Sequence, residues 1–164
     1  MRRLTVLMRS TLLMNPSLSA LCGELERVWH DTIPLTRALE IKVRSFDGKS
    51  LEVAAGLAPN INLHGTAFAG SLYAISALCG WSMVHLQLAM RELHGSIVLA
   101  EGHIRYLKPV AEDIVAVCRF GEQAAVFDQL QETGKARFPL TTQIQAKGED
   151  AAMFEGEFGV KLKP

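Results

Sequence analysis

The chain has 164 residues and a mass of 18.0 kDa, which is enough for one domain with its own hydrophobic core. Its 17 basic and 17 acidic residues cancel, so no overall field attracts it to nucleic acid or to an anionic membrane. The three cysteines, Cys22, Cys79 and Cys118, form no C-x-x-C pair. They are typical of reduced thiols packed inside a cytoplasmic protein, with a catalytic Cys79 as the alternative.

Residues 1–14 are expected to be a loosely ordered leader, and residues 15–164 a single domain. The leader does not match a signal peptide, because a charge interrupts its apolar stretch and no A-x-A cleavage site follows. A helix is predicted next, since Asn15 or Ser17 can cap it. Apolar residues then recur at helical spacing until a proline ends the segment: Leu18, Leu21, Leu25 and Val28.

Residues 38–57 predict a β-hairpin. Leu39, Ile41 and Val43 alternate with charged residues, which is the pattern of a strand with one buried face. Asp47 and Gly48 form the Asp-Gly pair that favours a tight turn between two strands. The return strand follows directly with a second alternating run.

Residues 53–90 contain no Asp, Glu, Lys or Arg. From about Gly70 to Leu93 this segment predicts a helix that is apolar on all sides, and such a helix lies in a core or in a membrane. It is long enough to span a bilayer. However, serines, a histidine and a glutamine interrupt it, and no basic cluster or aromatic belt flanks it. We therefore expect a buried central helix and no membrane span.

The second half of the chain predicts strands separated by glycine-containing turns. The expected strands cover residues 96–107, 113–120, 124–131, 137–146 and 151–162. The order of helix, hairpin, long buried helix and strands predicts an α+β fold. In this fold one antiparallel sheet wraps around the long central helix, and the first helix is an addition at the N-terminus.

The segment from Asn62 to Ser71 joins the predicted hairpin to the central helix. Gly65 and Gly70 permit unusual backbone angles and close approach of other groups. The first amides of a helix have no acceptor within the helix and stabilise negative charge. Such a helix end suits the oxyanion that forms when the carbonyl carbon of a thioester is attacked. A tight connection without a chemical role is the alternative.

This segment resembles the hot-dog thioesterase signature N-x-x-G-T-x-H-G-G, which begins the central helix of that fold. Four positions match in register: Asn62, Gly65, Thr66 and Gly70. Two depart from it, because Phe68 replaces the usual histidine and Ala69 replaces the glycine after it. In phenylacetate-type enzymes of this fold an Asp further along the helix acts as base or nucleophile, and the matching position is Ala77.

Residues 101–109, E-G-H-I-R-Y-L-K-P, resemble the family's central strand, D-x-N-x-x-Y-x-x-P, and Asp113 falls where the next strand opens. More narrowly, N-x-x-x-T-x-F-A-G-S-x-Y, G-W-S-M-V and I-V-L-A-E-x-H-I-R-Y-L-x-P-V resemble thioesterases of the YiiD C-terminal type. The resemblance spans roughly residues 18–162. It implies a hot-dog fold and a homodimer, with a tetramer as the alternative.

Glu101, His103 and Arg105 alternate with small apolar residues that include Ala100. A period of two places the polar side chains on one face of the strand and the apolar ones on the face toward the helix. In hot-dog dimers this strand pairs across the two-fold axis, near both active sites. The three side chains could therefore supply a base, a proton relay and an anion contact. An ion-pair network that fixes the dimer register is the alternative.

The resemblance implies hydrolysis of acyl-CoA or acyl-carrier-protein thioesters in fatty acid metabolism, without a cofactor. The catalytic candidates are Asn62, His64, Glu101 and His103, with a purely backbone-stabilising role as the alternative for His64. The substrate-binding candidates are Phe68, Ala69, Gly70, Ser71, Ser76 and Arg105. No metal is expected, because the histidines lack zinc-ligand spacing. Since the helix carboxylate is missing, a binding module that does not cleave and a dehydratase-like enzyme stay open as alternatives.

Overall fold

The computed structural model describes residues 17–163. The predicted leader over residues 1–14 and the candidate cap Asn15 therefore lie outside the described residues. In chain order the elements are α1 (Leu18–Thr32), α2 (Leu35–Ala38), β1 (Lys42–Phe46), β2 (Ser50–Ala55), the 3-10 helix η1 (Ala58–Asn60), α3 (Ala69–Ala89), β3 (Gly95–Tyr106), β4 (Ile114–Arg119), α4 (Ala124–Thr133), β5 (Lys135–Ala146) and β6 (Glu149–Leu162).

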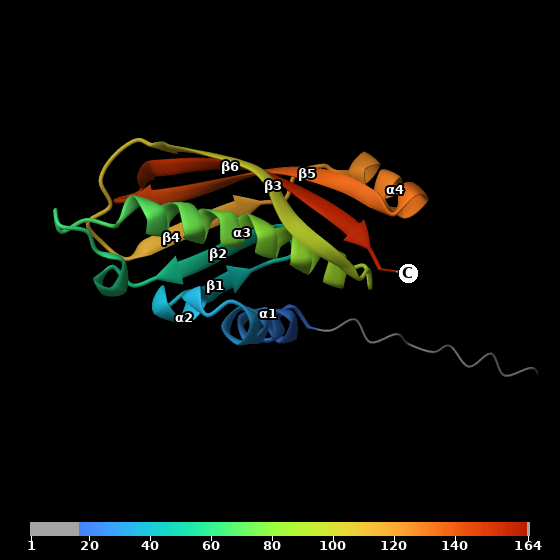
Figure 1. The fold of residues 1–164 in the computed structure, drawn as a ribbon, viewed down its shortest axis with the longest axis horizontal. Helices are drawn as coiled ribbons and strands as arrows, with labels where there is room; N and C mark the ends of the chain where they lie inside the picture. The colour runs from blue at the N-terminus through green and yellow to red at the C-terminus, as the bar shows by residue number, and fades with distance from the viewer. Residues whose placement is uncertain (1–16, 164) are drawn as a thin grey trace, which may run out of the picture.

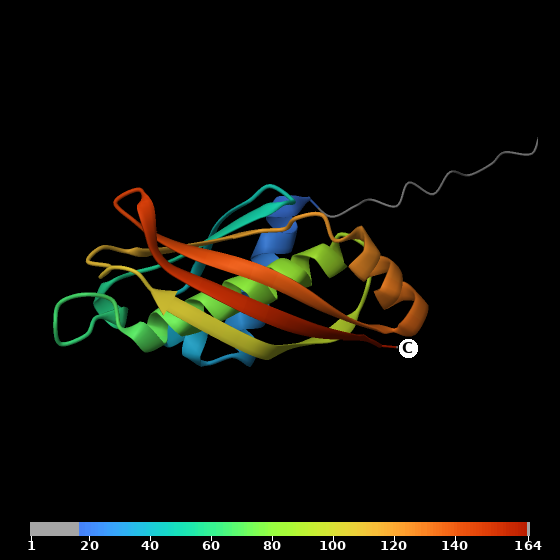
Figure 2. The same ribbon diagram turned by 90° about the horizontal axis from the view of Figure 1, so that it is seen from above.

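The six strands form one antiparallel sheet in the order β1-β2-β4-β5-β6-β3. The sheet curves around α3, which contacts every strand from β2 to β6 (Figures 1 and 2). The added helix α1 packs against β1 and α3. The predicted α+β fold, with a sheet wrapped around a long central helix and an extra N-terminal helix, is thereby confirmed.

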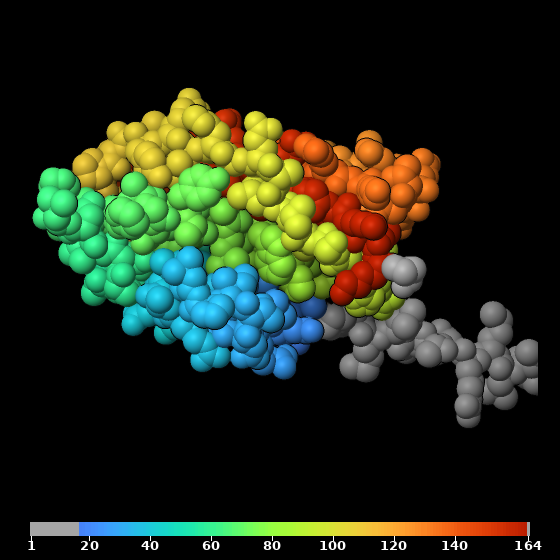
Figure 3. Space-filling view, viewed as in Figure 1, coloured from blue at the N-terminus to red at the C-terminus, as the bar shows by residue number. Residues whose placement is uncertain are grey.

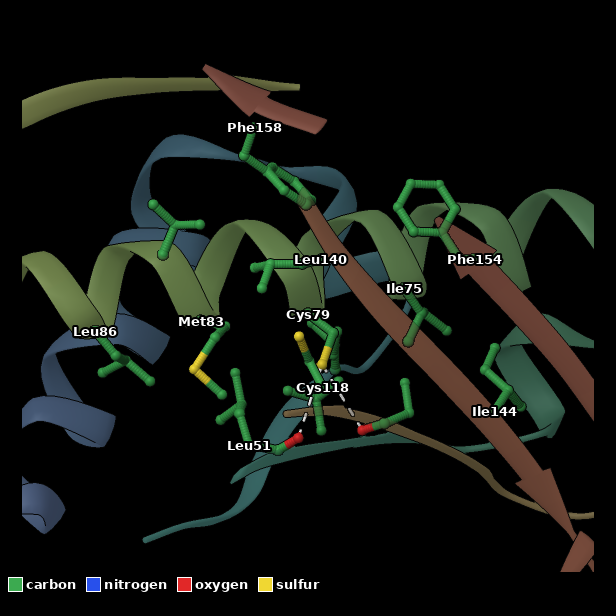
Figure 4. Packing of buried hydrophobic residues seen from close by; sticks show 14 of the residues in the cluster. Leu51, Ile75, Cys79, Met83, Leu86, Cys118, Leu140, Ile144, Phe154 and Phe158 are labelled. Carbon is green, nitrogen blue, oxygen red and sulfur yellow. Dashed lines mark hydrogen bonds between the residues drawn. The ribbon is translucent and has the colours of Figure 1, made fainter. Parts of the chain in front are cut away.

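The uncharged helix α3 is the centre of the hydrophobic core. Ile75, Cys79 and Met83 are fully buried on the side that faces the sheet (Figure 4). By length and composition α3 could cross a membrane, but 61% of its most apolar window is buried inside the fold. Its apolar character is thus explained by burial against the curved sheet, as the sequence predicts.

Helix α1 is capped and anchored as its sequence indicates. The Ser17 hydroxyl accepts a hydrogen bond from the amide of Ala20 at 3.2 Å, so Ser17 is the N-cap. Leu25 and Trp29 are fully buried, and the Trp29 indole Nε1 donates to the Ser82 hydroxyl of α3 at 3.0 Å. Because this hydrogen bond is buried, it fixes where α1 sits on α3.

The prediction of a strand over residues 124–131 was wrong, because this segment forms the helix α4. Its two buried residues, Phe127 and Leu130, are three positions apart, which suits one face of a helix better than one face of a strand. Gly134 then takes a left-handed φ of 73° and its amide donates to the Leu130 carbonyl at 2.9 Å. This ending is a typical glycine C-cap.

The hairpin of β1 and β2 is confirmed, but it is shorter than predicted. Residues 35–38 form the helix α2, and Glu40 takes a left-handed φ of 53° before β1 begins at Lys42. Leu39 and Ile41 are buried, as expected of the inner positions of a strand, yet they precede the first ladder pairs. Alternation of burial alone therefore overestimated the length of the strand.

Ala100 does not face α3, which corrects the predicted sidedness of this residue. A β-bulge between Leu99 and Glu101 reverses the alternation, so Ala100 is exposed. Before the bulge Ile97 and Leu99 pack against the core, and after it the inward positions have the opposite parity. The inward position Gly102 shows this, since a Cβ built there would lie 2.6 Å from the hydroxyl of Tyr73 on α3.

Candidate functional site

The loop before α3 is held by the side chain of Asn62. Its Oδ1 accepts hydrogen bonds from the backbone amides of His64 at 2.8 Å and Thr66 at 3.2 Å. Its Nδ2 donates to the Thr66 hydroxyl at 3.0 Å and to the Ala67 carbonyl at 3.3 Å. Gly65 has a φ of 74° at the turn, where a residue with a side chain would be strained. Asn62 therefore builds the loop and lies half-buried within it.

The start of α3 leaves its first amides free. Two backbone hydrogen bonds of 2.7 Å, from Ala67 to Val110 and from Phe68 to Asn60, fix the chain just before the helix. Phe68 is the N-cap residue and provides no side-chain cap. Within residues 17–163 the amides of Ala69, Gly70 and Ser71 have no acceptor, since the first helical bond is from Leu72 to Phe68. Three aligned donors with the positive end of the helix dipole favour an anion here.

The Phe68 ring covers one side of this helix end. A Cβ built on Gly70 would lie 2.4 Å from a ring atom, so the ring rests on the first turn directly over this glycine. The ring is also 55% exposed, so it forms a wall of the site rather than a plug. Ser71, the next residue, is buried in the same turn.

Tyr106 is a site residue to which the sequence reasoning gave no role. Its hydroxyl donates to the Ala69 carbonyl at 2.9 Å and thereby ties the end of β3 to the start of α3. Burial, with a smaller contribution from the nearby Tyr73, raises the pKa of Tyr106, so the hydroxyl stays protonated and remains a donor. Its position in the I-R-Y-L-x-P motif, on the same side of β3 as Gly102, was the available signal.

His64 lies at the exposed tip of the loop, next to Leu63, which is 90% exposed. Its backbone amide is bound to Asn62, whereas its imidazole ring makes no hydrogen bond to the described residues. The ring is therefore free to contact a ligand that approaches this loop.

Glu101, His103 and Arg105 form a separate group on the outer face of the sheet. All three are exposed on the face away from α3, as the alternation predicts. Glu101 and His103 line an open cavity of 390 Å³ together with residues of β5 and β6, which include Glu155 and Glu157. Arg105 donates to the sulfur of Met153 at 3.2 Å. Within one chain, the sheet thus separates these residues from the loop of Asn62 and His64.

The comparison with known families decides where this chain belongs. The family described as “Putative thioesterase (yiiD_Cterm)” matches residues 22–162. The chain belongs to this family. Its fold is also that of a thioesterase from Shewanella oneidensis, described as putative, which is 40% identical with a TM-score of 0.83. That match covers 89% of this chain and 100% of the other.

Further solved structures share the fold of this YiiD C-terminal family member. A protein of unknown function from Chlorobaculum tepidum TLS is 28% identical, with a TM-score of 0.85 over 88% of this chain and 96% of the other. The E. coli PaaI protein, from the phenylacetic acid degradation operon, is 16% identical, with a TM-score of 0.63 over 90% of this chain and 97% of the other. The likeness to the PaaI protein concerns the fold alone.

The helix α3 of this thioesterase-family protein provides no carboxylate to the site. Its sequence from Ala69 to Ala89 holds no Asp or Glu, and Ala77 lines an apolar cavity of 240 Å³. Ser76, predicted to contact substrate, is fully buried instead and does not line that cavity. Any carboxylate that acts on a substrate here must therefore come from another part of the fold or from a second subunit.

Cys79 is placed as a core residue of this family member. It is fully buried, and burial raises the pKa of its thiol well above the ordinary value. Its sulfur lies 3.9 Å from the Leu51 carbonyl oxygen and 3.8 Å from that of Ala116, so its single hydrogen has acceptors inside the core (Figure 4). A protonated, enclosed thiol is a poor nucleophile. Across residues 17–163, no three His, Cys, Asp or Glu side chains gather as metal ligands would.

Proposed function

We propose that this protein hydrolyses acyl thioesters of coenzyme A or acyl carrier protein. The observation that carries this proposal is the uncapped start of α3, where the amides of Ala69, Gly70 and Ser71 have no acceptor among the described residues. The developing oxyanion of a tetrahedral intermediate is a better acceptor than the neutral carbonyl. Donors fixed in this way therefore lower the barrier rather than merely bind the substrate.

In this mechanism His64 is the general base. Its imidazole takes a proton from water, and the water oxygen attacks the thioester carbonyl carbon. The carbonyl electrons move to the oxygen that the α3 amides hold. When the intermediate collapses, the carbon–sulfur bond breaks and the proton passes from His64 to the departing thiolate. The products are a carboxylic acid and a thiol, and Asn62 acts by keeping the loop of His64 in place.

We assign the active unit to a homodimer that forms through β3. This strand is 12 residues long and lies at the edge of the sheet, where β6 is its only neighbour among residues 17–163. A long edge strand exposes a row of unpaired amides and carbonyls that readily pairs with another strand. Val98 and Tyr106 on this strand are large apolar side chains that are 60% and 49% exposed. A second copy of β3 would pair with this edge.

In such a dimer Glu101, His103 and Arg105 would lie at the seam between the subunits, on the outer face of the joined sheet. We assign Arg105 and His103 to contacts with the anionic carrier of the thioester. Glu101 is a weaker candidate for the base than His64, because its own sheet separates it from the α3 amides. The free thiols of Cys79 and Cys118 support a reducing, cytoplasmic location.

The oxyanion role is tested by replacing Ala69 with proline. Ala69 is the first residue of α3, where proline is compatible with a helix, and the preceding Phe68 has the extended backbone that proline requires. The variant removes one amide hydrogen and should lower kcat for acyl-CoA hydrolysis by about 10²–10³. Leu18→Pro makes the same change at the start of α1 and should retain activity. Equal activity of the wild type and Ala69→Pro would refute the proposed oxyanion site.

A binding module that holds acyl thioesters without cleaving them is the second candidate, because α3 lacks a carboxylate. Purified full-length protein is incubated with acyl-CoAs of different chain length, and free thiol is measured. Binding by calorimetry without thiol release would favour the module over the hydrolase.

A further inference from the structure

An apolar cavity lies along α3, where the surface of that helix is visible between the α1–α2 segment and β3 (Figure 3). Its volume is 240 Å³. From α3 it is lined by Ala74, Ala77, Leu78 and Trp81, and the other walls are apolar residues of the α1–α2 segment and Leu99 of β3.

The few polar atoms in these walls have partners elsewhere. The Thr36 hydroxyl donates to the Ile33 carbonyl at 2.8 Å, and the indole Nε1 of Trp81 donates to the Ile97 carbonyl at 3.1 Å. A polar ligand would therefore lose its hydration without gaining hydrogen bonds here. The cavity suits a hydrocarbon.

The cavity is aligned with the free amides of α3. Gly70, Ala74, Ala77 and Trp81 follow one another at intervals of three or four residues, so they lie on the same side of the helix. At 1.5 Å per residue, the Cα of Trp81 lies roughly 16 Å along the helix from that of Gly70, and the indole leans back toward the N-terminus as helical side chains do, which shortens the path. A group that starts at the oxyanion site can thus extend along this side of α3 until it meets the indole.

Among the α3 residues that line the cavity, Trp81 lies furthest from Gly70. Its ring stacks on that of His85, with centroids 5.2 Å apart and an interplanar angle of 13°. Together with the hydrogen bond to Ile97, this contact fixes the orientation of the indole. Beyond it, His85 and residues such as Glu24, Glu92 and His94 line a second cavity of 390 Å³, which has a polar rim.

We propose that the 240 Å³ cavity receives the acyl chain of the thioester and that Trp81 limits the chain length. This inference rests on the proposed function. A methylene group is similar in size to a water molecule, which takes up about 30 Å³, so the cavity holds about eight such groups. The preferred substrate is therefore a medium-chain acyl thioester of about the length of octanoyl, and palmitoyl exceeds the space.

Two variants test the cavity from opposite directions. Ala77→Leu fills it and should lower the ratio of kcat/KM for octanoyl-CoA over acetyl-CoA by about tenfold, because several methylene contacts are lost. Trp81→Ala joins the two cavities and should raise the ratio for palmitoyl-CoA over octanoyl-CoA by about tenfold. Ala125→Leu, at an exposed position of α4, is the matched control and should retain the wild-type profile. Circular dichroism establishes that each variant is folded.

Binding of a non-hydrolysable octanoyl-CoA thioether, measured by calorimetry, separates this inference from the proposed function. If thioesters are not cleaved but the thioether binds and Ala77→Leu abolishes its binding, the cavity assignment holds and the hydrolase proposal fails. If octanoyl-CoA is cleaved and the folded variants keep the wild-type chain-length profile, the cavity assignment is overturned while the hydrolase proposal stands. If the wild type neither cleaves nor binds these compounds, both are wrong.

Discussion

Replacing Asn62 by alanine tests whether the loop before α3 positions the reacting groups. The variant leaves the backbone amides of His64 and Thr66 without their acceptor and removes the donors to Thr66 and Ala67. Each hydrogen bond contributes about 1 kcal/mol net, and water replaces part of this in a half-buried loop, so the loss should be about 1–2 kcal/mol. For a domain of this size the Tm should fall by roughly 3–6 °C.

The effect on turnover should exceed the effect on stability. Because the loop holds both His64 and the chain that enters α3, we expect kcat for an acyl-CoA to fall by about 10–100-fold. The assay is thiol release by folded protein, with Tm from calorimetry. Asn62→Asp is the matched control, since it keeps the acceptor oxygens but loses the donors, and it should lie between the wild type and Asn62→Ala. Wild-type turnover by Asn62→Ala would refute the role of the loop.

Four further outcomes follow from the structure. Tyr106→Phe loses the hydrogen bond to the Ala69 carbonyl, and it should lower the rate of thiol release by about three- to tenfold while the free energy of unfolding changes by less than about 1 kcal/mol. Unchanged turnover would exclude a positioning role for Tyr106. Trp29→Phe leaves the buried Ser82 hydroxyl without its donor and should lower the free energy of unfolding, measured in urea, by about 2–4 kcal/mol. The control Leu35→Phe, at an exposed position, should change this free energy negligibly. A thiol reagent at mildly alkaline pH should label the half-buried Cys22 well before Cys79 or Cys118. Burial encloses Cys79 and Cys118, raising the pKa of Cys79 well above its ordinary value and that of Cys118 to about 12. Mass spectrometry of the labelled peptides gives the order of labelling, and the opposite order would contradict this reasoning. Burial lowers the pKa of His85, although Glu24 opposes the shift, so the folded state binds a proton at His85 less readily than the unfolded state. The free energy of unfolding should therefore fall as the pH drops below about 6.5. His85→Gln should make this dependence on pH less steep.

The sequence predicted the parts of the fold that depend on strong local patterns. The uncharged run between residues 53 and 90 identified α3 as the core helix, and Asp47-Gly48 identified the first turn of the sheet. The α4 segment was misassigned because it is short and the three-residue spacing of Phe127 and Leu130 was not taken as one face of a helix. Ala100 was misplaced because a bulge leaves no mark in residue type, yet it reverses every later position on the strand.

The candidate site was predictable as a loop but not as an arrangement in space. The motif around Asn62 and Gly70 located the start of α3, and the alternation along β3 grouped Glu101, His103 and Arg105 correctly. What the alternation did not reveal is that the curved sheet separates this outer group from the loop of Asn62 and His64, because that depends on the tertiary packing of α3. For the same reason the hydroxyl of Tyr106, on the inner side of β3, received no role beforehand.

The position of β3 at the sheet edge has a consequence for how the molecule assembles. Its neighbour, β6, begins more than 40 residues later in the sequence, and β6 in turn pairs with β5. During synthesis β3 therefore emerges long before the strand that attaches it to the rest of the sheet. Until β6 arrives, one side of α3 remains uncovered, and the nascent chain depends on slow, long-range pairing that is exposed to misassociation.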